Sequence, residues 1–461
     1  MMKNNVILFI TAILTLTPLS SFGDTYVTAG NGQTYSFATL VTIEGSGVSQ
    51  GEDCIVVNGT VEISEGDYFV MDSGVMVRFA DGAELIIKGS PTFTPEEQTT
   101  LTKALTATTP YNVEVWGGNS QIEVSNLNFE YVGLRCFSPY GMYVHDCQFT
   151  DHCGTQSAAL MIGPDEAPFH IKDCYFANNA KAAIGSAANY FCPVKIEDCS
   201  FYHNSTANGN IPQLNLTASQ MVEVTGCTIE GNPSLTMVGG IAVSNFYTIE
   251  SFNVSITGNT ITDNRYGITT MGMMDVVIAD NILKDNCHET NPNNGGSGIS
   301  LYDPYMKQTV MVRGNHIENS LWGITVIGCG NVNIGRVDVE ESDEQYNPGC
   351  NVFKNNGNGG ILYDLYNNST NTIYAQGNQW NVAEQTEEDI ESVIFHQHDN
   401  PALGEVIFMP PMEMSAIDTV KEDAFSSGTY SLNGIRVSPQ ESSSLQKGIY
   451  IINGKKRIVR K

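Results

Sequence analysis

Two short tracts of this chain place tyrosines next to carboxylates. They read Leu301-Tyr302-Asp303-Pro304-Tyr305 and Leu362-Tyr363-Asp364-Leu365-Tyr366, and a Gly-Ile pair precedes each of them. Tyrosine rings stack on the apolar face of a sugar, and carboxylates accept hydrogen bonds from its hydroxyl groups. The candidate glycan-binding residues are therefore Tyr302, Asp303, Tyr305, Tyr363, Asp364 and Tyr366.

The two tracts are one residue out of phase when they are counted from Ile299 and Ile361. In a β-strand, a shift of one residue turns the side chains to the opposite face. The tracts form one platform only if a turn absorbs the extra residue. The alternative is two unrelated surfaces.

Histidines and acids suggest a second kind of chemistry. The motif His396-Gln397-His398 places two imidazoles on one face of a strand, and Asp399 could supply a third metal ligand, with no fourth ligand in sight. The acidic run from Asp338 to Glu344 suits Ca²⁺, although it lacks a recognisable calcium-loop spacing. No cofactor is firmly implied, and Ca²⁺ is the cation that we consider.

A repeat must position these residues. Segments such as Val144-His145-Asp146-Cys147-Gln148-Phe149 and Ile256-Thr257-Gly258-Asn259-Thr260-Ile261 recur along the chain. Their aligned polar positions are Cys147, Cys174, Cys199, Cys227, Asn259, Asn281, Asn315, Asn351 and Asn378, at irregular spacings of 22 to 36 residues. Short strands that end in polar turns at such a period indicate a solenoid.

Eleven cysteines would first suggest disulfides if the chain is exported. Four of them stand in the repeat where other units have asparagine, which favours an inward column of free thiols that pack as small apolar residues. The odd total leaves at least one free thiol in a monomer. A disulfide between cysteines such as Cys136 and Cys153 is the alternative for the remaining residues.

Two further columns complete the repeat. Five residues after the first column come Asn179, Asn204, Asn232, Asn264, Asn286 and Asn356. The pairs Ala183-Ile184, Gly240-Ile241, Gly267-Ile268, Gly298-Ile299, Gly323-Ile324 and Gly360-Ile361 follow shortly after. Each unit is expected to form strand, bend and strand, stacked as rungs about 4.8 Å apart, and inward asparagines can bond to one another along a column.

This pattern resembles the right-handed parallel β-helix superfamily, the pectate-lyase-like fold, over residues 111–385. The predicted fold class is all-β, a three-sheet solenoid. Residues 24–110 are expected to form its N-terminal cap and opening rungs, with a short helix from Pro95 to Ala107 suggested by a capping box at Thr94 and Glu97. Residues 386–411 resemble a closing cap, and the acidic stretch Glu384 to Glu391 is compatible with a helix.

The two ends of the chain indicate export. Lys3, an apolar run from Val6 to Leu19 and small residues before Asp24 predict a signal peptide over residues 1–23. The run is shorter than the roughly 20 residues of a membrane-spanning helix, so we expect no transmembrane segment. After a linker, 412–425, residues 426–461 resemble the C-terminal sorting domain of the Bacteroidetes type IX secretion system. The residues that carry the resemblance are Leu432, Asn433, Gly434, Arg436, Val437, Lys447, Gly448, Tyr450, Asn453, Gly454 and Lys456.

The charge of the chain is uneven. Seven of its 22 Lys and Arg residues lie in 426–461, which contain one acid, so residues 24–425 hold 14 basic against 49 acidic residues, a balance of −35. Such a body should repel nucleic acid and anionic membranes. The charge fits either a solubility device or cation binding.

Catalytic motifs of β-helix enzymes are not recognisable in the sequence. Hydrolases need clustered carboxylates, and lyases need a base and a group that neutralises the substrate carboxylate. Residues 111–385 hold four arginines, Arg135, Arg265, Arg313 and Arg336, none in a lyase-like motif, and Arg265 fits an ordinary turn of the repeat.

The sequence therefore favours an extracellular or outer-membrane surface protein that reaches its place through the periplasm. Its expected partners are the type IX secretion machinery and an extracellular polysaccharide or host matrix glycan, bound without catalysis as an adhesin would bind it. The alternative is a divergent polysaccharide lyase or glycoside hydrolase. A passive structural spacer is the third interpretation.

Overall fold

The computed structural model describes residues 25–108, 111–154, 158–163, 167–186, 192–217, 220–245, 250–413, 429–431, 436–437, 448–452 and 455–459. The predicted signal peptide, residues 1–23, and most of the predicted linker lie outside these residues. The chain divides into two compact units, residues 1–411 and 412–461.

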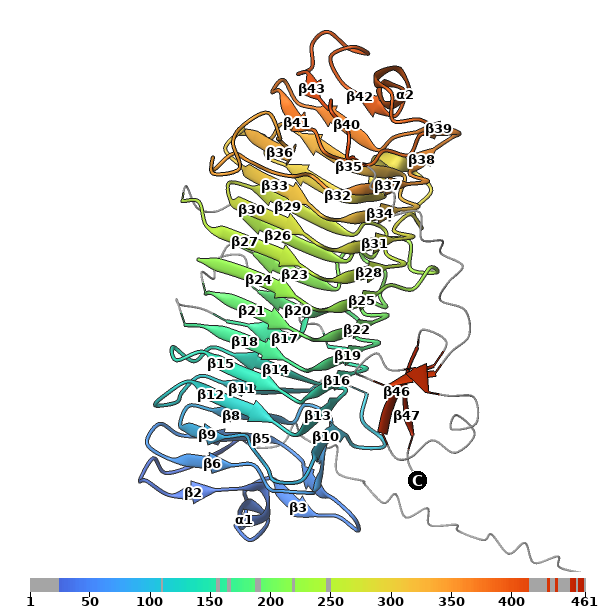
Figure 1. Cartoon of the computed structure of the whole chain (residues 1–461). Helices are drawn as coiled ribbons and strands as arrows, with labels where there is room; N and C mark the ends of the chain where they lie inside the picture. Colours follow the sequence, from blue (N-terminus) through green and yellow to red (C-terminus); the bar gives the residue numbers. More distant parts are fainter. Residues whose placement is uncertain are drawn as a thin grey trace, which may run out of the picture. The chain divides into compact units, whose positions relative to one another are not determined.

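The first unit is built from three long sheets, in which neighbouring strands are parallel except β3 and β4 (Figure 1). Sheet A contains β1 (Tyr26–Val27), β5 (Thr60–Ile63), β8 (Glu84–Ile87), β11 (Tyr111–Val115), β14 (Val132–Cys136), β17 (Ala158–Ile162), β20 (Ala182–Ser186), β23 (Leu214–Thr217), β26 (Ile241–Asn245), β29 (Ile268–Gly272), β32 (Ser297–Tyr302), β35 (Trp322–Ile327), β40 (Leu365–Asn368) and β42 (Ile394–Phe395). Sheet C contains β3 (Val48–Gln50), β4 (Ile55–Val57), β7 (Met76–Phe79), β10 (Thr99–Lys103), β13 (Leu127–Glu130), β16 (Gln148–Thr150), β19 (Tyr175–Ala177), β22 (Ser200–Tyr202), β25 (Thr228–Glu230), β28 (Thr260–Thr262), β31 (Ile282–Lys284), β34 (His316–Glu318) and β37 (Val352–Lys354).

Sheet D completes each rung, because the chain passes from sheet D to sheet C to sheet A and then returns to sheet D. Its strands are β12 (Ile122–Ser125), β15 (Met142–His145), β18 (Phe169–Lys172), β21 (Val194–Glu197), β24 (Met221–Thr225), β27 (Asn253–Thr257), β30 (Asp275–Ala279), β33 (Thr309–Arg313), β36 (Asn331–Gly335), β41 (Ile373–Ala375) and β43 (Val406–Ile407). Two smaller pairings are sheet B, with β2 (Thr34–Tyr35), β6 (Tyr68–Val70) and β9 (Ser90–Thr92), and the hairpin of β38 (Gly357–Asn358) with β39 (Ile361–Leu362). The prediction of an all-β, three-sheet parallel β-helix is confirmed.

The bend between sheets D and C explains the Asp-Cys and Gly-Asn pairs of the repeat. The residue before each column position has a positive φ, for example Asp146 at 52°, Gly226 at 66° and Asp280 at 57°. This left-handed conformation is open to glycine and is tolerated by aspartate and asparagine better than by other residues. The next side chain then points inward.

The first column is buried, as predicted. Asn259, Asn281, Asn315 and Asn351 each donate a side-chain hydrogen bond of 2.9 Å to the amide oxygen of the next asparagine. The four cysteines of the column are buried, and all eleven cysteines of the chain are free, including Cys136 and Cys153. Burial raises the pKa of the Cys136 thiol to about 12, so this thiol stays protonated and unreactive.

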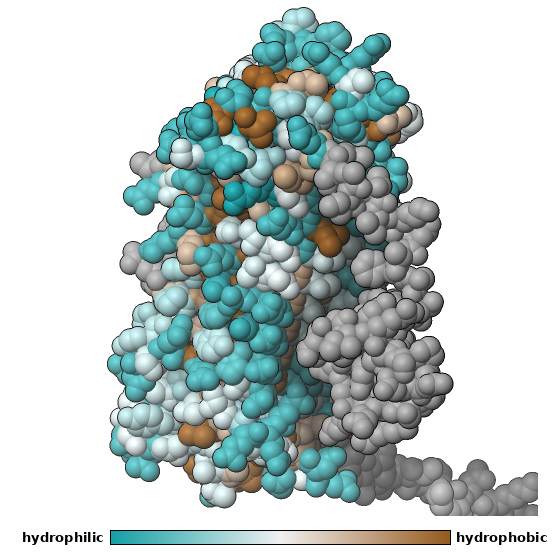
Figure 2. All heavy atoms as spheres, viewed as in Figure 1, coloured by the Kyte–Doolittle hydropathy of each residue, from teal (hydrophilic) through white to brown (hydrophobic). Residues whose placement is uncertain are grey.

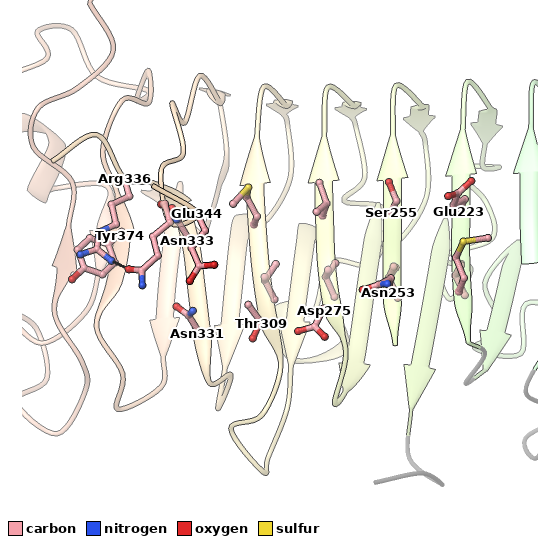
Figure 3. Close-up of a pocket in the computed structure, with 18 residues that line it drawn as sticks. Glu223, Asn253, Ser255, Asp275, Thr309, Asn331, Asn333, Arg336, Glu344 and Tyr374 are labelled. Carbon is pink, nitrogen blue, oxygen red and sulfur yellow. Dashed lines mark hydrogen bonds between the residues drawn. The ribbon is translucent and has the colours of Figure 1, made fainter. Parts of the chain in front are cut away.

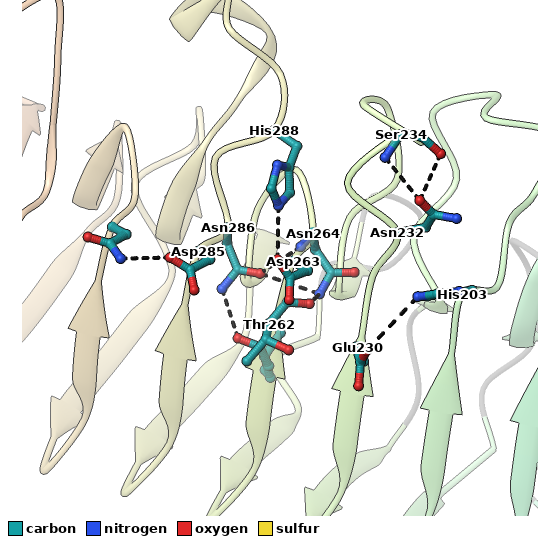
Figure 4. A network of polar contacts seen from close by, with 12 residues as sticks. His203, Glu230, Asn232, Ser234, Thr262, Asp263, Asn264, Asp285, Asn286 and His288 are labelled. Atoms are coloured by element: carbon teal, nitrogen blue, oxygen red, sulfur yellow. Dashed lines mark hydrogen bonds and ion pairs between the residues drawn. The ribbon is translucent and has the colours of Figure 1, made fainter.

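The second column is also formed, with one correction (Figure 4). Asn264 donates to Asn286 at 3.3 Å. Asn204 donates to the Gln213 side chain at 3.0 Å. Gln213 in turn donates to Asn264 at 3.0 Å, so it occupies the place predicted for Asn232. Asn232 is instead half-buried and accepts hydrogen bonds from Ser234, because the longer chain segment of that rung turns it away from the interior.

The Gly-Ile pairs stand where two successive residues face the interior at the bend into sheet A. A Cβ atom on Gly298 would lie 2.5 Å from Cγ2 of Ile317, which explains the small residue. The prediction is wrong for Gly360-Ile361: Ile361 is 55% exposed in the β38–β39 hairpin. Leu365 pairs with Ile324 and takes the buried position instead.

Aromatic and aliphatic side chains fill the space between the sheets. Phe129, Phe149, Phe176 and Phe201 stack on successive rungs of sheet C, with centroids 4.7, 4.8 and 5.1 Å apart. On the face seen in Figure 2, most of the described surface is hydrophilic and apolar residues occur in small separate groups. Among the described residues, no helix has the length and apolar character to cross a membrane.

The helix predicted from Pro95 to Ala107 is wrong. Thr99–Lys103 forms β10, which pairs in parallel with β7 and β13 and buries Leu101, so tertiary pairing prevails over the capping signal. The helix of the N-terminal cap is α1 (Phe37–Val41), with a capping box at Ser36 and Thr39 and with Phe37 and Leu40 buried. At the other end α2 (Glu387–Glu391) begins after its N-cap Thr386 and buries Ile390, within the acidic stretch predicted to be compatible with a helix.

The second unit contains an antiparallel four-stranded sheet in the order β45-β44-β46-β47. Its strands are β44 (Thr429–Ser431), β45 (Arg436–Val437), β46 (Gly448–Ile452) and β47 (Lys455–Val459). Six of the residues that carry the resemblance to a sorting domain lie outside the described residues: Leu432, Asn433, Gly434, Lys447, Asn453 and Gly454.

Candidate functional site

Asp303, a predicted ligand of sugar hydroxyls, lies in the interior of the fold. Its side chain has no exposed surface, and its carboxylate accepts hydrogen bonds from the backbone N–H groups of Tyr305 at 2.9 Å and Gln308 at 2.6 Å. It therefore closes the loop after β32. The expectation that this carboxylate faces the surface is wrong, because the loop needs an acceptor for its inward N–H groups.

Asp364 is buried for a different reason. It stands just before Leu365, at the bend position that carries glycine in other rungs, and its side chain therefore points inward. There its carboxylate accepts hydrogen bonds from the Asn381 backbone at 2.8 Å and from the Asn356 side chain at 3.3 Å. Asp364 thus ends the second column. The prediction that its carboxylate faces a ligand on the surface is wrong.

The burial of Asp364 predicts a pH-dependent stability. Burial raises the pKa of its carboxyl group to about 7, so the folded chain holds this proton more tightly than the unfolded chain. The resulting stabilisation is complete below the unfolded pKa near 4 and is lost as the pH rises through 7, by about 1 kcal/mol per pH unit in between. Asp364→Asn should remove this dependence. Urea unfolding of both proteins between about pH 5 and pH 8 measures it, and parallel pH profiles for the two proteins would contradict it.

The predicted tyrosines do not form one platform. Tyr302 faces outward on sheet A in register with Ile327, whereas Tyr366 is in register with Ser300 and Thr325, in the neighbouring row. Tyr305 is 73% exposed on the loop after β32. Of the six predicted residues, Tyr366 lines a cavity, and the ring centroid of Tyr363 lies 6.0 Å from that of Tyr366.

That cavity is a groove of about 660 Å³ on the outer face of sheet A, here called the sheet A groove. Its floor consists of outward side chains of β23, β26, β29, β32, β35 and β40, among them Thr269, Ser300, Thr325 and Tyr366. Its wall is made by the bends that lead into sheet A. The described residues that line it include no Asp, Glu, His or Lys.

Arg265 is the cation of this groove, and it is 92% buried, since 8% of its surface is exposed. Its Nε atom has no hydrogen-bond partner, and its guanidinium carbon lies 5.0 Å from the centroid of the Tyr266 ring. Tyr266 is held against Gly239, where a Cβ atom would lie 2.1 Å from the ring. A buried donor that has no acceptor is costly.

An aromatic cluster forms the other end of the groove. Trp322, the first residue of β35, packs against Tyr363 and Tyr366 with centroid distances of 4.5 and 4.8 Å. Tyr366 also stacks on Phe395 of the next rung at 4.5 Å. Trp322 and Tyr366 keep part of their surface exposed in the groove. Partly exposed aromatic rings above polar threonines and serines suit a sugar ring with hydroxyl groups.

The predicted metal ligands are occupied by protein contacts. β42 ends at Phe395, so His396 and His398 lie in a turn and not on one strand. Nε2 of His396 lies 2.9 Å from the Glu391 carboxylate, its Nδ1 accepts from the Val406 N–H at 2.8 Å, and Asp399 caps the His396 backbone. His398 also approaches Glu391, at 3.0 Å.

No group of three or more His, Cys, Asp or Glu side chains that could hold a metal ion occurs among the residues that the structure describes. In the acidic run, Asp338 pairs with Arg336 at 3.3 Å. The geometry therefore gives no support to the Ca²⁺ site considered for Asp338 to Glu344.

Sequence reasoning missed Arg265 and Trp322. The sequence predicts that Arg265 is an ordinary turn residue. It does lie in a bend of the chain, but its side chain also lines the groove. The available signal was an arginine beside a tyrosine in a body with few basic residues. Trp322 precedes the Gly323-Ile324 pair and gave no signal of its own, because the outward row to which it belongs is visible only in the register of sheet A.

A family model described as "Protein of unknown function (DUF1565)" matches residues 183–386. This span is less than half of the chain, and it includes every described residue that lines the sheet A groove. The family is associated with parallel β-helix proteins, in agreement with the observed sheets. Searches of curated proteins and of solved structures found no match.

Proposed function

We propose that this chain is an exported protein that binds an extracellular glycan in the sheet A groove and does not cleave it. The observation that carries the proposal is Arg265, the cation of a groove whose described lining holds no carboxylate. The aromatic surface of Trp322 and Tyr366 at the same groove supplies the stacking platform. A glycan that carries carboxylate or sulfate groups fits this combination best.

The acidic body does not oppose this ligand class at short range. The formal net charge of the chain is −28, but charges farther away than about 8 Å are largely screened at physiological ionic strength. Inside the groove, the hydrogen bonds of a guanidinium to a carboxylate or sulfate are charge-assisted and therefore stronger than neutral ones. The local chemistry of Arg265 outweighs the long-range repulsion.

Binding is favoured over cleavage by the residues present. Hydrolysis of a glycosidic bond uses two carboxyl groups on opposite sides of the bond, and the described lining residues of the groove include none. Asp303 and Asp364, which could have supplied such a pair, are buried in structural roles. The alternative is a lyase or hydrolase, and the test below must distinguish cleavage of the glycan from binding without cleavage.

Export and location rest on the sequence of the two ends. The predicted signal peptide would carry the chain to the periplasm, and residues 426–461 would direct it through a type IX secretion system to the cell surface or the medium, as in Bacteroidetes. The short antiparallel strands of the second unit support this proposal. Secretion of the full chain, compared with a chain that ends at residue 425, tests it.

The glycan proposal is tested by incubating the full chain with acidic and neutral polysaccharides and following polymer size and protein retention by chromatography. We expect retention on an acidic polymer without a change in its size. Arg265→Met should weaken binding by roughly tenfold to a hundredfold, because a charge-assisted hydrogen bond is lost. Arg313→Met removes the same charge from an exposed position outside the groove and should leave binding unchanged.

Two outcomes would overturn the proposal. Shortening of any polymer would show an enzyme. Equal weakening by Arg265→Met and Arg313→Met would show that the overall charge of the body, and not the groove, governs retention.

A further inference from the structure

A second groove, of about 420 Å³, lies on the outer face of sheet D and is here called the sheet D groove (Figure 3). It crosses the strands β24, β27, β30, β33, β36 and β41, and the loop after β36 closes one end. Six strands at a spacing of about 4.8 Å give it a length of about 24 Å. It belongs to a different face of the solenoid from the sheet A groove.

Part of the floor of the sheet D groove is apolar. Val277 and Met311 occupy neighbouring rungs of one outward row and are half-buried, and Met221 lines the groove farther along. Methionine side chains are flexible and polarisable, so they adapt to aliphatic groups of different shape. This floor suits an aliphatic side chain of a ligand.

Three carboxylates also line the groove. Glu223, Asp275 and Glu344 line it, and the strand neighbour of Glu223, Lys195, is bound to Glu197 at 2.9 Å. Asp275 accepts a hydrogen bond from Ser251 at 2.7 Å, which leaves its charge in place. In Figure 3 the three carboxylates are spread along the groove and not gathered at one point. A ligand with several positive charges in a row would match them.

The cation that lines the groove is already engaged. Arg336 pairs with Asp338 at 3.3 Å, donates to the Gln345 side chain and lies 3.9 Å from the centroid of the Tyr374 ring. Its charge is therefore neutralised within the wall of the groove. The same contact covers the face of Tyr374, the aromatic residue among the described lining residues, so no ring is free to stack on a sugar.

The polar groups along the edge suit a peptide backbone. Asn253 and Asn331 are exposed at the ends of β27 and β36, and each amide side chain offers both donors and an acceptor. An extended peptide advances about 3.4 Å per residue, so about seven residues span the groove. We propose that the sheet D groove binds a basic, extended polypeptide segment of another protein, with Lys or Arg side chains on the carboxylates and an aliphatic side chain on Val277 and Met311.

The test uses the full chain and a fluorescent peptide of about eight alternating lysine and leucine residues. Fluorescence anisotropy measures its affinity for the wild-type chain, for the groove variant Glu223→Gln/Asp275→Asn/Glu344→Gln and for a matched variant, Glu52→Gln/Asp53→Asn/Glu65→Gln. The second variant changes the net charge equally at three exposed positions outside the groove. We expect the groove variant to bind about tenfold or more weakly, since it loses three ion pairs, and the matched variant to bind as the wild type does.

A glutamate-leucine peptide and a fully deacetylated, cationic oligosaccharide of glucosamine serve as further ligands. Equal loss of affinity in both variants, or equal affinity for the two peptides, would overturn the proposal by showing a nonspecific charge effect or simple apolar adhesion. Binding of the oligosaccharide with no binding of the lysine-leucine peptide would also overturn it, in favour of a cationic glycan. Unchanged affinity of the Arg265→Met variant for the peptide separates this groove from the proposed glycan site.

Discussion

Asn281→Ala is expected to lower the free energy of unfolding by about 4 kcal/mol. Asn281 lies in the middle of the first column, where its amide oxygen accepts from the side chain and the backbone of Asn259 at 2.9 and 3.0 Å. Its amide nitrogen donates to the Ile256 carbonyl and to Asn315, both at 2.9 Å. The alanine variant leaves several of these groups without their protein partner at a position that is 1% exposed.

The matched control is Cys199→Ala, at an equivalent place in the same column. The Cys199 thiol is also 1% exposed, but it contributes mainly packing, so its loss should cost only about 1 kcal/mol. Urea unfolding followed by far-ultraviolet circular dichroism compares the two variants. Equal costs would show that the asparagines stabilise the column by volume alone and that their hydrogen bonds contribute little.

Trp322→Ala is expected to weaken glycan binding by about 2 kcal/mol, or roughly thirtyfold in Kd, because large aromatic residues that pack against a ligand contribute much of the affinity of a binding surface. Trp322 also keeps Tyr366 in place, with a centroid distance of 4.8 Å. Isothermal titration with the acidic polysaccharide found in the first screen measures the effect. Thermal unfolding of the same variant shows whether the fold persists.

Trp116→Ala provides the comparison for this prediction. Trp116 is 47% exposed, stacks on Phe137 at 4.2 Å and lies outside the sheet A groove. Its loss should leave the affinity unchanged. If both tryptophan variants bind the glycan as strongly as the wild type, the groove is not the binding surface and the proposal for Arg265 fails with it.

The two grooves divide the surface of the solenoid between two ligand classes. The sheet A groove has a buried cation, partly exposed aromatic rings and no acid among its described lining residues. The sheet D groove has carboxylates, the apolar side chains of Val277 and Met311, and a cation that is engaged by its own wall. In a parallel β-helix, each sheet presents a separate row of outward side chains, so one body can carry both surfaces without coupling them.

The sequence by itself determined the solenoid. Every bend needs a residue that tolerates a left-handed backbone and then an inward polar or thiol side chain, and these requirements recur as Asp-Cys and Gly-Asn pairs. Such local demands leave a periodic signal that can be counted. The signal failed where a rung changes length, as at Asn232 and Gly360, because a longer segment brings a different residue to the bend.

Only the tertiary structure decided which side chains face a ligand. Asp303 and Asp364 lie in tracts whose composition suits ligand binding. However, Asp303 is buried because it closes a loop, and Asp364 is buried because it stands at a bend. The residues of the sheet A groove come from neighbouring rungs whose paired residues are 25 to 41 positions apart in the sequence, and their rows follow from the register between strands. Inward positions repeat because the core requires the same packing in every rung, whereas outward positions carry no such constraint and can be recognised only after the strands are paired.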